Sequence, residues 1–298
     1  MKLVLKIAIL LVLNVCSFLA WAHWPVGRYG YTSASTNGVV QLIPEDRHVS
    51  VVIAGSSHGR QFSYGPSYDA TRRLLGSDTL NISKAGKGPY VERIFLEYFF
   101  ERGNTADTIL YVVDPWAMYS DAWNERSDFL DDEAFSPDFL WHLVQERVTP
   151  GTIAEYIRTK YSLTWLTTRP LPVSEHDSAL SAVDRAAIAK RLIALYPNGV
   201  DADAFERYSR DLERCIMLAL EHKSRVIVLL PPTLLGIQPG DAQMRALLND
   251  LKQRYHVDVV DAARLLTAPR YYGNHDHLNS RGIEALIRLR FAALMVNR

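Results

Sequence analysis

The sequence is poor in cysteine and has no excess charge of either sign. Its 298 residues include only Cys16 and Cys215, which are too few for a disulfide framework. Lys and Arg together number 33, as do Asp and Glu, so the formal net charge is zero. This balance gives no reason to expect nucleic acid as a partner. No glycine-rich loop ends in the Lys-Ser or Lys-Thr pair of a P-loop, and we expect no cofactor.

Residues 1–22 have the composition of a targeting segment. Lys2 and Lys6 form a short positive start, which is followed by a mostly apolar run. The triplet Ala20-Trp21-Ala22 fits a small-x-small cleavage site, and residues 3–22 are also just long enough to cross a bilayer. We therefore expect export to the periplasm or the extracellular space. The segment is either a cleaved signal peptide or an N-terminal anchor that contacts the membrane.

A buried strand is expected at residues 49–54, where β-branched side chains dominate. It ends in the turn Gly55-Ser56-Ser57-His58-Gly59. A serine at the carboxyl end of a strand stands where open α/β sheets bind their ligands, so Ser57 is the candidate nucleophile. An ordinary strand-to-helix turn has the same composition. His58 either lines the pocket or is an exposed loop histidine.

Strands and helices alternate along most of the remaining chain. Further strands are expected at residues 79–83, 108–113, 225–230 and 257–260, and helices at 60–75, 90–102, 201–222, 241–255 and 279–295. This order predicts an α/β fold with a mostly parallel sheet and right-handed crossovers.

The sequence divides into a linker or arm at residues 23–48 and an α/β domain at 49–298. Within the domain, residues 117–200 break the alternation and predict a helical insertion that shapes a substrate cleft. Its helical patterns cover residues 138–147, 151–159 and 178–195. Aromatic residues are dense at 116–142, where they either stack on sugar rings or fill the core.

A second polar motif, Asn274-His275-Asp276-His277, precedes the last predicted helix. A serine needs a base within hydrogen-bond reach, and the base needs an orienting acceptor. His277 is the candidate base. Asp276 is one candidate orienter, although neighbouring side chains in an extended chain point apart. Asn274 is the other, through its carbonyl oxygen.

The same motif is also compatible with a metal site. His275 and His277 are spaced so that both imidazoles lie on one face of an extended segment, and His58 could join them from the first turn. A zinc site needs at least three protein ligands, and a third ligand is not obvious near this motif. We therefore expect no metal.

Together, the two motifs resemble those of the SGNH (GDSL-like) hydrolase superfamily, specifically its branch of cell-surface polysaccharide O-acetyltransferases. Gly55-Ser56-Ser57 resembles the first block, with Ser56 in the usual aspartate position. The run from His277 to Gly282 resembles the last block. The resemblance covers about residues 49–290 and implies a three-layer α/β/α fold.

The resemblance also implies roles for residues between the two motifs. A glycine after the second strand donates its N–H to the oxyanion, and Gly86 matches it best by position, with Gly88 as the other choice. Asp114 stands where the family often has an asparagine that binds the oxyanion or substrate, but a carboxylate donates only when it is protonated. Asp114 would then fix the Ser57 loop or cap a helix. Asn274 stands where the family usually has the orienting aspartate.

The activity implied is that of an exported serine-dependent acyl-ester hydrolase or O-acyltransferase. Its substrate would be an acylated carbohydrate of the cell envelope or another ester, and its partner a membrane-bound acyltransferase. The alternative is a catalytically inactive SGNH-like module that binds glycan or partner proteins in an envelope assembly. The residues Asn274 and Asp114 favour this alternative, because both depart from the family pattern.

Overall fold

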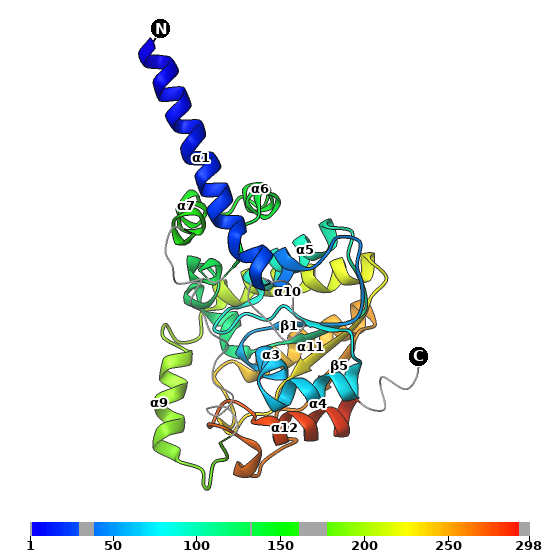
Figure 1. Cartoon of the computed structure of the whole chain (residues 1–298). Coiled ribbons are helices and arrows are strands. Elements are labelled where there is room, and N and C mark those ends of the chain that lie inside the picture. Colours follow the sequence, from blue (N-terminus) through cyan, green and yellow to red (C-terminus); the bar gives the residue numbers. More distant parts are fainter. Residues whose placement is uncertain (1, 30–38, 132, 161–177, 292–298) are drawn as a thin grey trace.

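A five-stranded parallel sheet forms the centre of the chain in a computed structural model (Figure 1). The structure describes residues 2–29, 39–131, 133–160 and 178–291. The strand order is β2-β1-β3-β4-β5, and every neighbouring pair is parallel. The strands are β1 (His48–Gly55), β2 (Thr79–Asn81), β3 (Thr105–Val112), β4 (Arg225–Leu230) and β5 (Asp258–Asp261).

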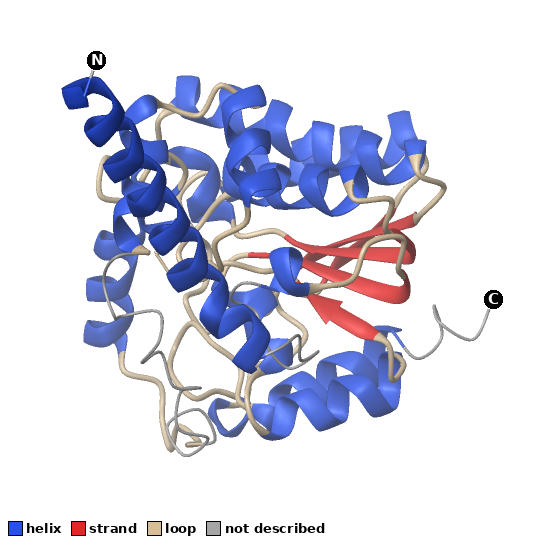
Figure 2. Cartoon of the chain, turned by 45° about the horizontal axis from the view of Figure 1, so that its top comes forward, coloured by secondary structure: helices blue, strands red, loops and turns tan. Residues whose placement is uncertain are grey.

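Helices cover both faces of this sheet (Figure 2). One face carries α4 (Pro66–Leu75), α12 (Ser280–Leu286) and the π-helical turn η7 (Ile287–Phe291); the other carries α5 (Pro89–Glu101), α10 (Ala202–Glu221) and α11 (Asp241–Tyr255). Alternation within β1 explains the two layers, because Val51 and Ile53 pack on the first face while Val52 and Ala54 pack on the second. The predicted three-layer α/β/α fold is confirmed.

The strand order reverses between β1 and β3. The chain leaves β1 toward β2 on one side and later returns to β3 on the other side. In such a doubly wound sheet the connecting loops diverge at this point, which creates a crevice outside the carboxyl ends of the strands. The residues that follow β1 and β3, including Ser57 and Asp114, therefore lie at the position where this fold class binds ligands.

The predicted insertion contains three α-helices among the described residues: α6 (Pro137–Gln145), α7 (Pro150–Thr159) and α9 (Arg185–Leu195). Each begins at a side-chain cap, because Ser136, Thr149 and Asp184 accept hydrogen bonds from backbone N–H groups of the first turn. The third helix starts at Arg185 rather than at residue 178. Residues 161–177 of the predicted insertion lie outside the described part.

Short elements connect these larger ones. They are α2 (Val39–Leu42), α3 (Ser57–Arg60), η1 (Gln61–Ser63), η2 (Pro115–Tyr119), η3 (Asp121–Trp123), η4 (Ser127–Leu130) and η6 (Pro269–Tyr271). The N-terminal helix α1 (Lys2–Tyr29) continues beyond the predicted boundary at residue 22. Residues 30–38 of the predicted linker and 292–295 of the predicted last helix lie outside the described residues.

Candidate active site

The turn after β1 presents Ser57 and buries Ser56. Gly55 has φ = 142°, and a Cβ at this position would lie 2.3 Å from the carbonyl oxygen of Val112 in β3, so only glycine fits. The chain then enters α3, whose first residue is the half-buried Ser57. The hydroxyl of Ser56 is buried and donates a hydrogen bond to Asp114. Of the two serines, Ser57 is the one whose hydroxyl is available for chemistry.

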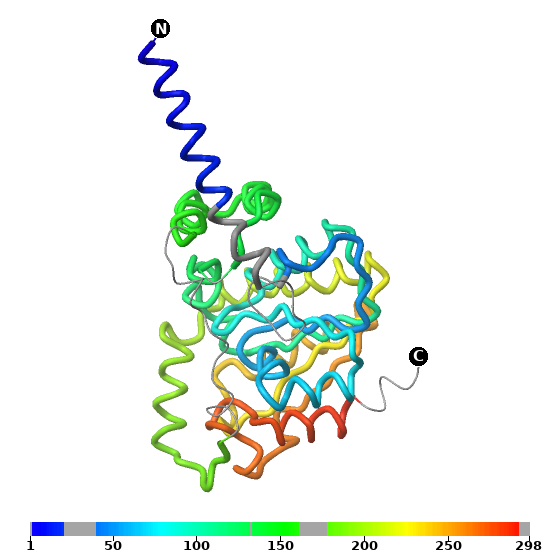
Figure 3. Tube along the Cα trace, viewed as in Figure 1, coloured from blue at the N-terminus to red at the C-terminus, as the bar shows by residue number. Residues whose placement is uncertain are grey.

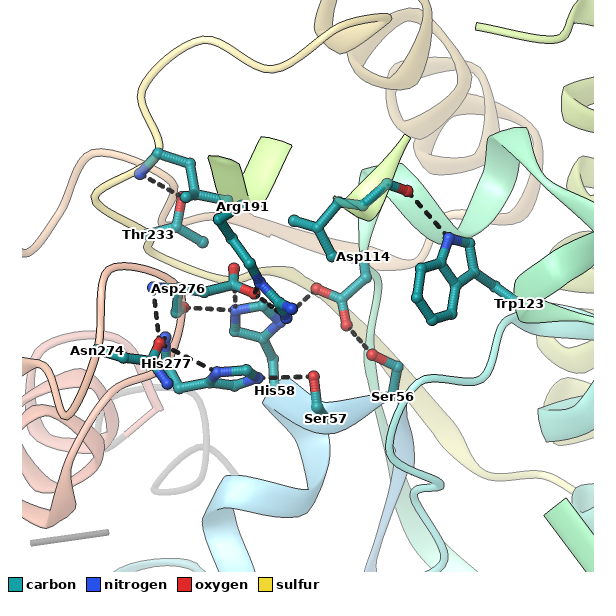
Figure 4. Close-up of polar contacts among 12 residues, drawn as sticks. Ser56, Ser57, His58, Asp114, Trp123, Arg191, Thr233, Asn274, Asp276 and His277 are labelled. Carbon is teal, nitrogen blue, oxygen red and sulfur yellow. Dashed lines mark hydrogen bonds and ion pairs between the residues drawn. The ribbon is translucent and has the colours of Figure 1, made fainter. Parts of the chain in front are cut away.

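His277 lies beside Ser57 with its ring held from both sides (Figure 4). Its Nε2 is 2.7 Å from Ser57 Oγ, and its Nδ1 is 3.2 Å from Asn274 Oδ1. The same Asn274 oxygen accepts the backbone N–H groups of Asp276 and His277, each at 2.9 Å. Because these backbone groups are obligate donors, the oxygen of Asn274 must face them. Nδ1 of His277 is then the donor, and Nε2 is left to accept the Ser57 proton.

The carboxylate of Asp276 turns away from the imidazole of His277. Its Oδ2 accepts hydrogen bonds from Nε and Nη2 of Arg191 in α9, at 2.9 and 2.7 Å. Its Oδ1 lies 3.3 Å from His58 Nε2. Of the two candidate orienters, Asn274 therefore makes the contact with the His277 ring and Asp276 does not.

His58 is fully enclosed between two carboxylates. Its Nδ1 lies 2.5 Å from Asp114 Oδ1, and its Nε2 lies 2.7 Å from the backbone carbonyl oxygen of Asp276. Both partners are acceptors, so these contacts favour the imidazolium form of the ring. Burial alone would lower the pKa of His58, but Asp114 and Asp276 raise it well above its usual value.

The His58 ring stacks on the His277 ring, with centroids 4.8 Å apart and planes 26° apart. Burial lowers the pKa of His277 to about 4, and the positive charges of His58 and Arg191 act in the same direction, against Asp276 and Asp114. Burial alone would raise the pKa of Asp276, but the same two cations hold it well below its usual range. At neutral pH the site therefore contains a neutral His277 beside two cations and two carboxylates.

His58 and Asp114, two of the predicted pocket residues, are both buried. His58 and Asp114 are only 4% and 3% exposed, and their polar atoms are occupied by each other, Ser56 and Asp276. His58 is therefore not an exposed loop histidine, and neither residue presents a free group to a substrate. Asp114 caps no helix through its side chain. Instead its carboxylate accepts the hydrogen bond of the Ser56 hydroxyl in the turn that carries Ser57.

The loop after β2 lies against the Ser57 turn. The Lys84 N–H donates to the Gly55 carbonyl at 2.9 Å, and the two oxygens of Glu92 accept the N–H groups of Gly55 and Lys84, each at 3.2 Å. Burial raises the pKa of Glu92 well above its usual value. Gly86 follows in the same loop with φ = 68°, and its N–H has no acceptor among the described residues. Gly88, the other candidate, donates its N–H to the Trp123 carbonyl.

His58, Asp276 and His277 place possible metal-ligand atoms within 4.8 Å of one another. However, the Arg191 guanidinium occupies the side of the Asp276 carboxylate that a metal cation would need, and His58 carries its own positive charge. The remaining histidine of the motif, His275, accepts the N–H of Asp184 at its Nε2, so it faces α9. The chemistry of this donor set does not suit a metal ion.

Two residues of the site, Arg191 and Glu92, are not predicted by the sequence motifs. Arg191 lies in a helix whose described surface is mostly exposed, and its partner Asp276 is 85 residues away. Nothing in the sequence connects the two. Glu92 could have been found, because it stands three residues before Phe95 on the apolar side of a predicted helix, where an acidic residue needs polar partners.

The aromatic residues of the stretch 116–142 mostly fill the core. Trp116, Tyr119, Phe129, Phe135 and Phe139 are all buried. Trp123 is the exception near the site, because its half-buried ring lies 3.7 Å from the position that a Cβ of Gly86 would take.

No protein-family model matches the sequence, and no curated protein matches it. Solved structures with similarity to the chain include a proposed acylhydrolase from Bacteroides fragilis, at 10% identity and a TM-score of 0.43, covering 83% of this chain and 88% of that one. Protein YxiM from Bacillus subtilis has 12% identity and a TM-score of 0.43, covering 84% and 56%. A carbohydrate acetylesterase family member from Sinorhizobium meliloti has 10% identity and a TM-score of 0.40, covering 84% and 100%.

Proposed function

We propose that the chain is an exported serine-dependent acyl-ester hydrolase or O-acyltransferase that acts on a cell-envelope or extracellular polysaccharide. The observation that carries the proposal is the 2.7 Å contact between Ser57 Oγ and His277 Nε2, in a tautomer fixed by Asn274. A nucleophile, a base and an orienting group in this sequence of contacts form the arrangement that activates a serine.

In the proposed reaction, Ser57 Oγ attacks the ester carbonyl while its proton passes to His277 Nε2. The N–H groups of Ser57 and Gly86 are the donors for the resulting oxyanion; the first lies in the opening turn of α3, where N–H groups lack helical partners. The imidazolium of His277 then protonates the departing sugar oxygen, which leaves an acyl-Ser57. Water or an acceptor hydroxyl attacks this ester while His277 takes its proton. His277 then returns the proton to Ser57 Oγ as the bond between Oγ and the acyl carbon breaks, and the acyl group departs with the attacking oxygen.

The polysaccharide part of the proposal comes from the resemblance to the O-acetyltransferase-like branch and from one local feature. The ring of Trp123 borders Gly86, the proposed oxyanion donor. An aromatic ring at this position offers a stacking face to a sugar whose acetyl group enters the site. A membrane-bound acyltransferase partner would supply or receive the acyl group if the reaction is transfer.

Labelling with a fluorophosphonate probe and hydrolysis of a chromogenic acetyl ester test the nucleophile. We expect both to be abolished in Ser57→Ala and retained in Ser63→Ala, a matched change at a half-buried serine of η1, the 3-10 helix that follows α3. Labelling that persists in Ser57→Ala would place the nucleophile elsewhere and refute the assignment.

A folded wild type with neither labelling nor esterase activity would favour the alternative function, an SGNH-like module that binds glycan or partner proteins. The observation that favours it is the amide of Asn274 at His277 Nδ1, because an amide stabilises the imidazolium less than a carboxylate does. Retained glycan binding in Ser57→Ala would support this alternative.

A further inference from the structure

The helix α1 is packed against the folded domain at the end of its apolar stretch. Residues 2–20 are long and apolar enough to cross a membrane, and residues Leu3–Val15 are exposed throughout. In contrast, Phe18 and Leu19 are half-buried against the main hydrophobic core. The Phe18 ring meets the Phe135 ring edge-on, with centroids 4.9 Å apart. The helix is thus held by the domain rather than joined to it by a free tether.

The helices α6 and α7 lie next to this contact between Phe18 and Phe135. Phe135 stacks on Tyr156 of α7 at 5.9 Å, and Tyr156 in turn contacts Phe139 of α6 at 5.6 Å. The two helices flank the point where α1 leaves the domain (Figure 1). The medium or protein that covers the apolar part of α1 must therefore lie next to the outer surfaces of α6 and α7.

The outer surface of α6 carries an apolar pair. The side chains of Trp141 and Val144 are 62% and 44% exposed, and their three-residue spacing places them on the same side of the helix. The opposite side of α6 is buried through Phe139, His142 and Leu143. The exposed polar residues Asp138 and Gln145 flank this pair, so the outer side of α6 is amphipathic, as on a helix that lies in a membrane interface.

We propose that α1 remains attached and spans a lipid bilayer, and that α6 lies along the bilayer surface with Trp141 and Val144 in the interface. Nineteen helical residues extend for about 28 Å, close to the thickness of a bilayer hydrocarbon core. Phe18 and Leu19 then lie at the end of the span, at headgroup level. A domain surface packed on them is at the same level, where tryptophan side chains are enriched.

The occupant of the apolar pair is a bilayer rather than a protein because α1 brings lipid to this side of the domain. Lys2 and Lys6 at the start of α1 agree with an N-terminus on the cytoplasmic side and the domain on the opposite side. The proposal does not depend on the chemistry of Ser57.

Spin labels in the full chain, reconstituted in vesicles of phosphatidylcholine and phosphatidylglycerol, test the arrangement. Cys16→Ser and Cys215→Ala remove the native thiols, and a nitroxide is attached at Val144→Cys. Leu289→Cys is the matched control, because Leu289 is also an exposed apolar residue and belongs to η7. The C-terminal segment that contains η7 lies on the side of the domain away from α1 (Figure 3). Oxygen partitions into lipid and a nickel chelate stays in water, so their collision rates report the surroundings of each label.

We expect the oxygen-to-nickel ratio to be several-fold higher for the label at position 144 than for the label at 289, with the N-terminus intact by mass spectrometry. Equal ratios would refute the docking of α6 on the bilayer. A label at 144 that is shielded from both reagents would show that a protein, such as a second copy, covers the patch. A mature N-terminus after residue 22 would refute the anchor itself.

Discussion

The acid limit of activity is the most direct test of the charge arrangement around His277. The proposed base acts only when neutral, so kcat/KM should fall as His277 of the free enzyme becomes protonated. With its pKa lowered to about 4, about 90% of His277 is neutral at pH 5. An unperturbed histidine with a pKa near 6.5 would be only about 3% neutral at that pH. We therefore expect nearly full kcat/KM at pH 5 rather than a loss of about thirty-fold.

Arg191→Gln removes one of the cations that lower the pKa of His277. It also leaves the Asp276 carboxylate with less compensation, which favours the imidazolium of His277. A unit charge several ångströms away through protein and water shifts a titration by about half to one and a half pH units. The acid limb of kcat/KM should move upward by this amount. Lys190→Gln is the control, because it removes an equal charge from an exposed position of the same helix.

The assay is hydrolysis of a chromogenic acetyl ester between pH 3.5 and 8, with circular dichroism at each pH to show that the protein remains folded. An acid limb near pH 6.5 in the wild type would refute the desolvation of His277. A limb that does not move in Arg191→Gln, or moves equally in Lys190→Gln, would refute the role of Arg191.

Further variants distinguish the orientation of His277 from the charge balance around His58 and from the support of the turn after β1. Asn274→Ala should lower kcat by about ten- to a hundred-fold, because the contact with His277 and the hydrogen bonds within the loop both disappear. Asn274→Asp keeps an acceptor for all of these contacts and should raise kcat. Equal kcat values for the wild type and both variants would exclude an orienting role for Asn274. Asp276→Asn should affect kcat at neutral pH less than Asn274→Ala does. His58→Gln leaves two buried carboxylates short of a cation, so urea unfolding should show a loss of about 3–5 kcal/mol. Glu92→Gln keeps only one carbonyl oxygen for the N–H groups of Gly55 and Lys84, and should cost about 1–3 kcal/mol of stability and lower kcat.

Periodicity was sufficient to predict the layers of the fold. The strand expected at 225–230 and the helix expected at 241–255 coincide with β4 and α11. These segments are long, regular and bounded by turn residues, so local pattern and tertiary packing agree. The last helix differs, because α12 ends at Leu286 and passes into a π-helical turn at Ile287–Phe291. Apolar spacing alone does not distinguish an α-helical from a π-helical turn over a few residues.

The proximity of Ser57 and His277 could be predicted because both lie next to elements whose places in the sheet the sequence indicates. Their supporting contacts could not. The carboxylate of Asp276 and the amide of Asn274 are both within three residues of His277, and sequence does not specify which one a tight loop turns toward the ring. That choice follows from Arg191 and His58, which hold Asp276 away from His277.

Helix α9, in the predicted insertion, contributes residues to the site. The helix α9 supplies Arg191, and the backbone of Asp184 just before it donates to His275 in the loop that carries the base. Without α9, His58 would be left as a single buried cation for the two carboxylates Asp114 and Asp276, and burial would favour protonation of one of them. The hydrogen bonds that hold Asp276 away from His277 would then weaken. The geometry at Ser57 therefore depends on a helix that the pattern of the α/β domain alone does not include.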